Sequence, residues 1–187
     1  MSDWTDLPQN LPVPEDDGAA SHLPGMELPI VRLPATDGRL VDLSAVSGRA
    51  VVYCYPRTGQ PGMPNPDGWD EIPGARGCTP QACGFRDYYD ELLARGARRV
   101  FGLSTQDPDY QREAAERLQL PFPLLSDRYL SFAREVNLPT FKVDGVTLLK
   151  RLTLIINDGA IEHVFYPVFP PDTHAQAVAD FLARHPR

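Results

Sequence analysis

Residues 50–56 read Ala-Val-Val-Tyr-Cys-Tyr-Pro, and this stretch constrains the fold most strongly. The run is continuous, apolar and rich in β-branched and aromatic residues, which is typical of a central strand buried on both faces. Pro56 ends it, because a proline cannot continue a central hydrogen-bonding ladder. A second run of this kind at residues 99–104 predicts a neighbouring buried strand.

Helical patterns alternate with these strands. A helix is expected over residues 79–95, with Gly96 as its stop signal, and another from the cap Asp107-Pro108 to about Leu118. The other expected elements are an entry hairpin (28–33 and 40–43), a strand (122–125), a helix (128–136), a hairpin (148–156 and 161–166) and a closing helix (172–184). This β-α-β-α-β-α-β-β-α order predicts an α/β domain with a thioredoxin-like fold, a central mixed sheet flanked by helices.

Composition sets limits on organisation and partners. Residues 1–24 are acidic and proline-rich and are expected to be an arm, packed or mobile, ahead of a folded domain at residues 25–187. The net charge is −7 and no lysine/arginine run occurs, which argues against nucleic-acid and anionic-membrane partners. No apolar stretch approaches the roughly 20 residues of a membrane span, and no signal-peptide pattern occurs. We therefore expect a cytoplasmic protein.

The chain has three cysteines, too few for a disulfide scaffold, so a spaced pair suggests redox or metal chemistry. Cys78 lies where a loop meets the start of the predicted helix. Unsatisfied backbone N–H groups and the positive end of the helix dipole face that position. A thiolate is stabilised there, and the thiolate is the nucleophile, so this placement predicts a reactive Cys78.

Cys83 follows five residues later on the same predicted helix. Ideal geometry puts the two Cα atoms about 8–9 Å apart, and a disulfide needs less than about 7 Å. A Cys78–Cys83 bond therefore requires the start of the helix to unwind. The spacing alone leaves open that these are two unrelated helix cysteines. Cys54, inside the apolar strand, is expected to be inert core, and the four scattered histidines predict neither a metal site nor a cofactor.

The segment GCTPQACGFRDYYDELLARGARRVFGLSTQD, residues 77–107, resembles the active-site helix and following strand of the peroxiredoxins. It is most similar to the Q-type, or bacterioferritin-comigratory-protein, branch, whose signature is PGCT-x-x-A-C-x-FRD. The resemblance extends over about residues 25–185. The matching positions are Gly77-Cys78-Thr79, Ala82-Cys83 and Phe85-Arg86-Asp87, with further similarity at residues 40–55, 120–127 and 150–153.

This resemblance implies a thiol-dependent peroxidase that reduces hydroperoxides. Cys78 would be the peroxidatic cysteine, Cys83 the resolving one, and Arg151 the cation that holds thiolate and peroxide. The disulfide between the cysteines would be re-reduced by thioredoxin or a glutaredoxin-like dithiol. A monomer suffices for such an intramolecular pair, with a dimer also open. The alternatives are a redox-sensing or interaction protein with little turnover, and a disulfide reductase, against which the cysteine spacing argues.

The chain departs from the family motif P-x-x-x-T-x-x-C, because Glu71 and Ala75 stand at its proline and threonine positions. Pro56 and Thr58 occur earlier, with about fifteen extra residues before Cys78. We interpret residues 60–73 as an insertion, and expect Pro56 to shield the cysteine and the Thr58 hydroxyl to bind the peroxide. The insertion itself is either a lid over the site or a packed surface loop.

Overall fold

The central sheet has five strands in the order β5-β4-β3-β8-β9 in the computed structural model, which describes residues 6–187. The middle strand β3 is parallel to β4, which is parallel to β5, and it is antiparallel to β8, which is antiparallel to β9. This mixed sheet confirms the expected α/β layout. The strands are β3 (Arg49–Cys54), β4 (Ala97–Ser104), β5 (Leu124–Ser126), β8 (Leu152–Asn157) and β9 (Ala160–Phe165).

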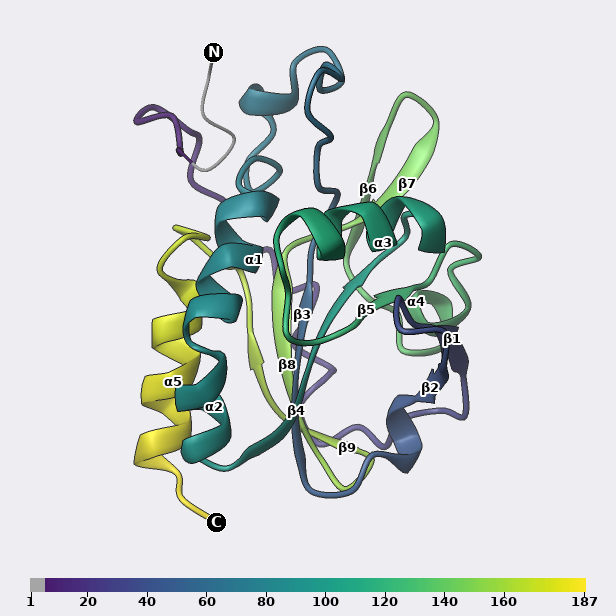
Figure 1. Cartoon of the computed structure of the whole chain (residues 1–187), viewed down its shortest axis with the longest axis vertical. Helices are drawn as coiled ribbons and strands as arrows, with labels where there is room; N and C mark the ends of the chain where they lie inside the picture. The colour runs from purple at the N-terminus through teal and green to yellow at the C-terminus, as the bar shows by residue number, and fades with distance from the viewer. Residues whose placement is uncertain (1–5) are drawn as a thin grey trace.

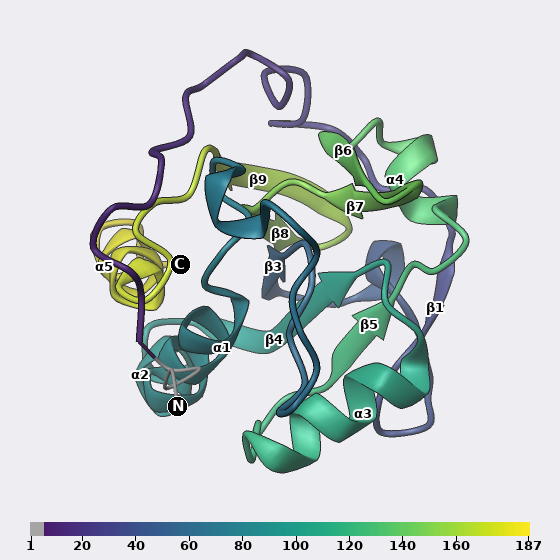
Figure 2. The same ribbon diagram turned by 90° about the horizontal axis from the view of Figure 1, so that it is seen from above.

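Helices cover both faces of the sheet (Figure 2). On one side lie α1 (Cys78–Asp87), α2 (Tyr89–Ala94), α3 (Pro108–Arg117) and α5 (His174–Arg184); on the other lie α4 (Ser131–Glu135) and the hairpin β1 (Arg32–Pro34) and β2 (Leu40–Asp42). Alternation along β3 builds one core on each face. Val51, Tyr53 and Tyr55 pack toward α1, α2 and α5, and Ala50, Val52 and Cys54 toward α4 and the N-terminal segment.

Two expectations about element boundaries were wrong. The helix expected over residues 79–95 is divided at Tyr88, where the backbone leaves helical geometry (φ −92°, ψ 4°). The strand expected over residues 148–156 is also divided. Its first part belongs to a separate hairpin, β6 (Thr140–Val143) and β7 (Val146–Leu149), which turns at Asp144-Gly145. Lys150 and Arg151 interrupt the ladder before β8.

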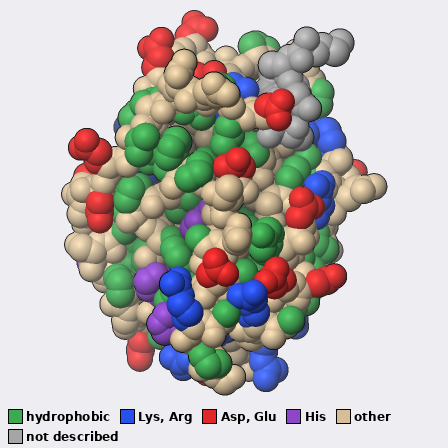
Figure 3. All heavy atoms as spheres, turned by 90° about the vertical axis from the view of Figure 1, so that its left-hand side faces the viewer, with side chains coloured by type: hydrophobic (Ala, Val, Ile, Leu, Met, Phe, Trp, Pro, Cys, Tyr) green, Lys and Arg blue, Asp and Glu red, His purple; other side chains and the backbone are tan. Residues whose placement is uncertain are grey.

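The described part of the N-terminal arm lies on the domain. Leu23 is fully buried in the core beside α4. The Asp17 carboxylate accepts bonds from Lys150 Nζ and the Tyr166 hydroxyl, each at 2.7 Å, and these hold the pKa of Asp17 well below its usual range. Residues 1–5 of the expected arm lie outside the described residues. On the face seen in Figure 3, hydrophobic side chains are interspersed with charges of both signs.

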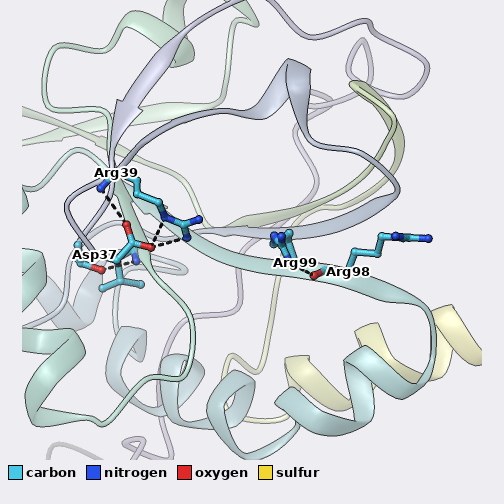
Figure 4. A network of polar contacts seen from close by, with 6 residues as sticks. Asp37, Arg39, Arg98 and Arg99 are labelled. Carbon is cyan, nitrogen blue, oxygen red and sulfur yellow. Dashed lines mark hydrogen bonds and ion pairs between the residues drawn. The ribbon is translucent and has the colours of Figure 1, made fainter.

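The two ends of the sheet differ in character. The parallel strands β3 and β4 end at the same edge, and from there the loop of residues 55–77 rises above the start of α1 (Figure 1). Arginines lie at the opposite end of the sheet. There Arg39 pairs with Asp37 at 2.6 Å, and Arg98 and Arg99 lie near the start of β4 (Figure 4). Within residues 6–187, no helix is long and apolar enough to cross a bilayer.

Candidate active site

Cys78 is the first residue of α1, and only 4% of it is exposed. The N-cap Gly77 has a left-handed backbone (φ 103°), and a Cβ there would meet Pro171 at 2.5 Å and Leu7 at 2.8 Å. Glycine therefore lets the chain turn sharply into the helix against the segment before α5. The Cys78 sulfur thus lies at a helix N-terminus, where backbone N–H groups favour negative charge.

Arg151 brings a positive charge to this sulfur. It is buried just before β8, with no carboxylate pairing with it among the described residues. Its guanidinium is held in one position by several acceptors, so its forked donors are pre-organised toward the thiol. The donors reach the carbonyl oxygens of Gly74 (3.2 Å), Ala75 (3.1 Å) and Arg76 (3.1 Å), the side-chain oxygen of Gln81, and Cys78 Sγ (3.2 Å).

Cys83 lies on the same helix and is half-buried. Cys83 packs against the core on the α1 side of the sheet, and burial raises the pKa of its thiol. In the intact helix burial therefore favours the protonated thiol of Cys83. Both cysteines are free, as the spacing on a regular helix requires.

Pro56 and Thr58 follow β3 and are both buried. The Thr58 hydroxyl donates to Gln106 Oε1 at 3.3 Å, and its carbonyl accepts from Gln106 Nε2 at 3.1 Å and from the Tyr110 hydroxyl at 3.0 Å. Arg57 and Gly59 line the hollow beside Cys78, whereas Thr58 lies outside that lining. In this structure the threonine is thus directed to Gln106, and its expected contact with the peroxide stays a prediction.

Two buried polar residues escaped the sequence reasoning. Gln81, one helical turn after Cys78, is fully buried and accepts from Arg151. The only feature of the sequence that could have indicated Gln81 is a polar residue on the buried face of a predicted helix. His174 bonds to the Thr153 hydroxyl at 2.8 Å, and its pKa is lowered to about 3 by burial first and by the charge of Arg151 second. It is therefore neutral at pH 7 and adds no charge beside Arg151.

The arrangement can perform nucleophilic chemistry at sulfur. Cys78 combines a helix N-terminus, a guanidinium at 3.2 Å and an adjoining hollow. These features stabilise a thiolate and the charge that develops on a leaving oxygen. Cys54 lacks all three features; it is fully buried on β3 and its pKa is raised by burial, as expected for inert core.

The chain is similar to known proteins along most of its length. The Redoxin family model matches residues 23–181. The chain is 33% identical to peroxiredoxin Q, chloroplastic, from Gentiana triflora, over 94% of this chain and 76% of that protein. It is 34% identical to peroxiredoxin Bcp from Escherichia coli (strain K12), over 84% and 93%. The crystal structure of peroxidoxin BcpB from Mycobacterium tuberculosis matches with a TM-score of 0.69 and 28% identity, over 88% of this chain and 98% of that one.

Proposed function

Because the chain belongs to the peroxiredoxin family, in its Q-type and Bcp branch, we propose that Cys78 is its peroxidatic cysteine and Cys83 its resolving cysteine. The chain is a thiol-dependent peroxidase, which reduces hydroperoxides with electrons from a thiol reductant. One observation carries the assignment of Cys78: its sulfur lies 3.2 Å from the Arg151 guanidinium at the start of α1.

In the first step the Cys78 thiolate attacks one oxygen of the hydroperoxide. An S–O bond forms as the O–O bond breaks, and the second oxygen leaves with a proton as water or alcohol. Cys78 is left as sulfenic acid. Arg151 stabilises both the thiolate and the charge on the departing oxygen, because its donors are already fixed by Gln81 and by backbone carbonyls.

In the second step Cys83 condenses with the sulfenic acid. Its thiolate attacks the Cys78 sulfur, the S–O bond breaks, and the oxygen leaves as water once protonated. The first turns of α1 must unwind, since a regular helix holds the Cα atoms too far apart. Unwinding also exposes Cys83 and so removes the burial that raises its pKa. Local unfolding thus lets Cys83 approach Cys78 and also makes the Cys83 thiol more reactive.

The roles of Pro56 and Thr58 belong to the same proposal. Pro56 follows β3 and is buried, which suits a residue that shields the cysteine. A Thr58 hydroxyl that binds peroxide has to exchange its 3.3 Å bond to Gln106 for one to the substrate. That bond is longer than the usual range of about 2.5–3.0 Å for hydroxyl donors, so the exchange costs little.

The remaining parts of the cycle are proposed from its chemistry. A dithiol such as thioredoxin or a glutaredoxin-like protein returns the disulfide to two thiols by exchange. Such recycling needs a reducing compartment, for which we propose the cytoplasm. The reacting pair lies within one helix, so a monomer can complete the cycle.

Intact mass and thiol count after one equivalent of hydrogen peroxide test these roles. The wild type should lose two hydrogen atoms with Cys54 still free. Cys83→Ser should instead gain one oxygen atom at Cys78, and Cys78→Ser should show neither change. If Cys78 stays reduced in every protein while peroxide persists, the assignment is wrong. If Cys78 is oxidised once but a thiol reductant supports no turnover, the redox-sensing alternative applies.

A further inference from the structure

The insertion of residues 60–73 forms part of the wall beside the Cys78 sulfur. Cys78 lines a hollow of only about 20 Å³. Its lining includes Thr79 and Pro80 of α1 and Asn65 and Trp69 of the insertion. A space of this size holds about one water molecule. Hydrogen peroxide is slightly larger than water and enters with a small adjustment, whereas an aryl or long alkyl group does not.

The wall is anchored to the domain. Only 4% of Trp69 is exposed, and its ring packs 6.3 Å from the Phe141 ring in a small cluster with Ala75 and Leu148. Burial of an indole contributes a large apolar area, enough to order a loop. The Arg57 guanidinium also lies over the indole, 5.8 Å from its centre. Trp69 therefore holds the insertion in place beside the hollow.

The same segment also borders a larger space. A mainly apolar cavity of about 300 Å³ is lined by Ile72, Pro73 and Gly74 together with Phe141 and Arg151. Cys78 is not among its lining residues. Room for a bulky substituent thus exists near Arg151 but not beside the sulfur, where the hollow is about 20 Å³.

On the premise of the proposed function, we propose that the insertion restricts this peroxidase to small hydroperoxides, with Trp69 as the specificity-determining residue. Removing the indole takes away the wall without removing the backbone carbonyls of residues 74–76 that hold Arg151. The reactive pair stays assembled while the entrance widens. The substitution should therefore change selectivity more than it changes the reaction with hydrogen peroxide.

The test compares single-turnover oxidation of Cys78 by hydrogen peroxide, tert-butyl hydroperoxide and cumene hydroperoxide. The wild type should react fastest with hydrogen peroxide and slowest with cumene hydroperoxide. Trp69→Ala should raise the rate for cumene hydroperoxide relative to hydrogen peroxide at least about tenfold, the scale on which a pocket wall discriminates. Asn65→Ala widens the same hollow without removing the anchor, and should shift the ratio in the same direction. Met63→Ala is the matched control, since Met63 is 56% exposed on the same insertion and outside the lining.

Two results overturn the inference and leave the proposed function intact. One is a wild type that reacts equally fast with all three peroxides. The other is an unchanged ratio in both Asn65→Ala and a Trp69→Ala protein whose circular dichroism shows that it is folded. A wild type whose Cys78 reacts with none of the three peroxides would instead overturn the proposed function, and the inference with it.

Discussion

Cys54 and Cys78 are buried to nearly the same degree, with 0% and 4% exposed, yet they lie in opposite electrostatic surroundings. Cys54 points from β3 into the apolar core beside α4. Burial raises its pKa, and the negative charge of Asp127 raises it further. Cys78 lies across the sheet at the start of α1, 3.2 Å from the Arg151 guanidinium.

The comparison separates two effects of burial. Desolvation alone disfavours a thiolate, and within residues 6–187 no positive charge opposes it at Cys54. At Cys78 a cation and a helix N-terminus are buried together with the sulfur, where low polarity strengthens their effect on a negative charge. The cysteine proposed to be reactive therefore differs from Cys54 in its neighbours, and Cys54 provides an internal control in the same chain.

The largest effect should come from removing the proposed nucleophile. Cys78→Ser should lower peroxidase activity by at least about 10³-fold, because neither Cys54 nor Cys83 has a hydrogen bond to Arg151 within the described residues. Cys54→Ala should keep the rate of the wild type, since it removes only a core side chain. Thioredoxin-coupled peroxide consumption measures both. Loss of activity in a folded Cys54→Ala protein would contradict the comparison.

Removing the cation should make Cys78 behave more like Cys54. Arg151→Ala should slow oxidation of Cys78 by about 10²–10³-fold, the usual cost of losing one preorganised donor to a developing charge. Arg151→Lys keeps the charge but loses the forked donors of the guanidinium. Its rate of Cys78 oxidation should therefore fall between those of the wild type and Arg151→Ala. Stopped-flow oxidation by hydrogen peroxide gives the rates. Arg98→Ala, at the opposite end of the sheet, is the control and should react like the wild type.

Much of the fold follows from local patterns in the sequence. The apolar run at β3, the Asp107-Pro108 cap of α3 and the hairpin that pairs residues 161–166 with the strand before them were all predicted and are present. Each depends on residues adjacent in the chain. The β6–β7 hairpin was missed although Asp144-Gly145 marks its turn, because the apolar residues on either side of Lys150 and Arg151 read as one strand.

The site was harder to predict because its contacts join distant segments. The family pattern indicated Arg151, but its bonds to Gln81 and to the carbonyls just after the insertion depend on the folded chain. The pairing of Thr58 with Gln106, 48 residues later, also has no local signal. The sequence therefore indicated Arg151 beside Cys78, but neither the arrangement of its donors nor the pairing of Thr58 with Gln106.

Cys83 offers a test of the second step alone. Cys83→Ser should leave the rate of Cys78 oxidation unchanged but abolish the disulfide, so sulfenic acid accumulates and dithiol-coupled turnover falls. In the wild type, disulfide formation should speed up as pH rises toward the raised pKa of Cys83, because more thiolate is then present. Rapid quenching with alkylation at several pH values measures this. A pH-independent rate would show that unwinding of α1, and not ionisation of Cys83, limits the step.

His174 is a buried base, so it extends the comparison of buried cysteines to a group that is positively charged when protonated. Its expected effect, on stability, is the smallest. His174 is 7% exposed, and its imidazole packs against the rings of Phe85 and Phe165. Burial lowers its pKa to about 3 in the folded protein, against about 6.5 when unfolded. Above pH 6.5 it is neutral in both states. Below that pH the unfolded chain gains a proton that the folded chain refuses, so stability falls as pH falls toward 3.

Between pH 7 and pH 5 this group should therefore reduce the free energy of unfolding by about 2 kcal/mol, from a slope of about 1.4 kcal/mol per pH unit. His174→Gln can keep a bond to Thr153 but cannot titrate, so its loss of stability over the same interval should be smaller by that amount. Urea unfolding of both proteins at pH 7 and pH 5 measures the difference. Other titrating groups, including the buried Asp127, are common to both proteins and cancel. Equal pH dependence in the two proteins would mean that His174 accepts its proton in the folded state, and that burial beside Arg151 does not keep it neutral.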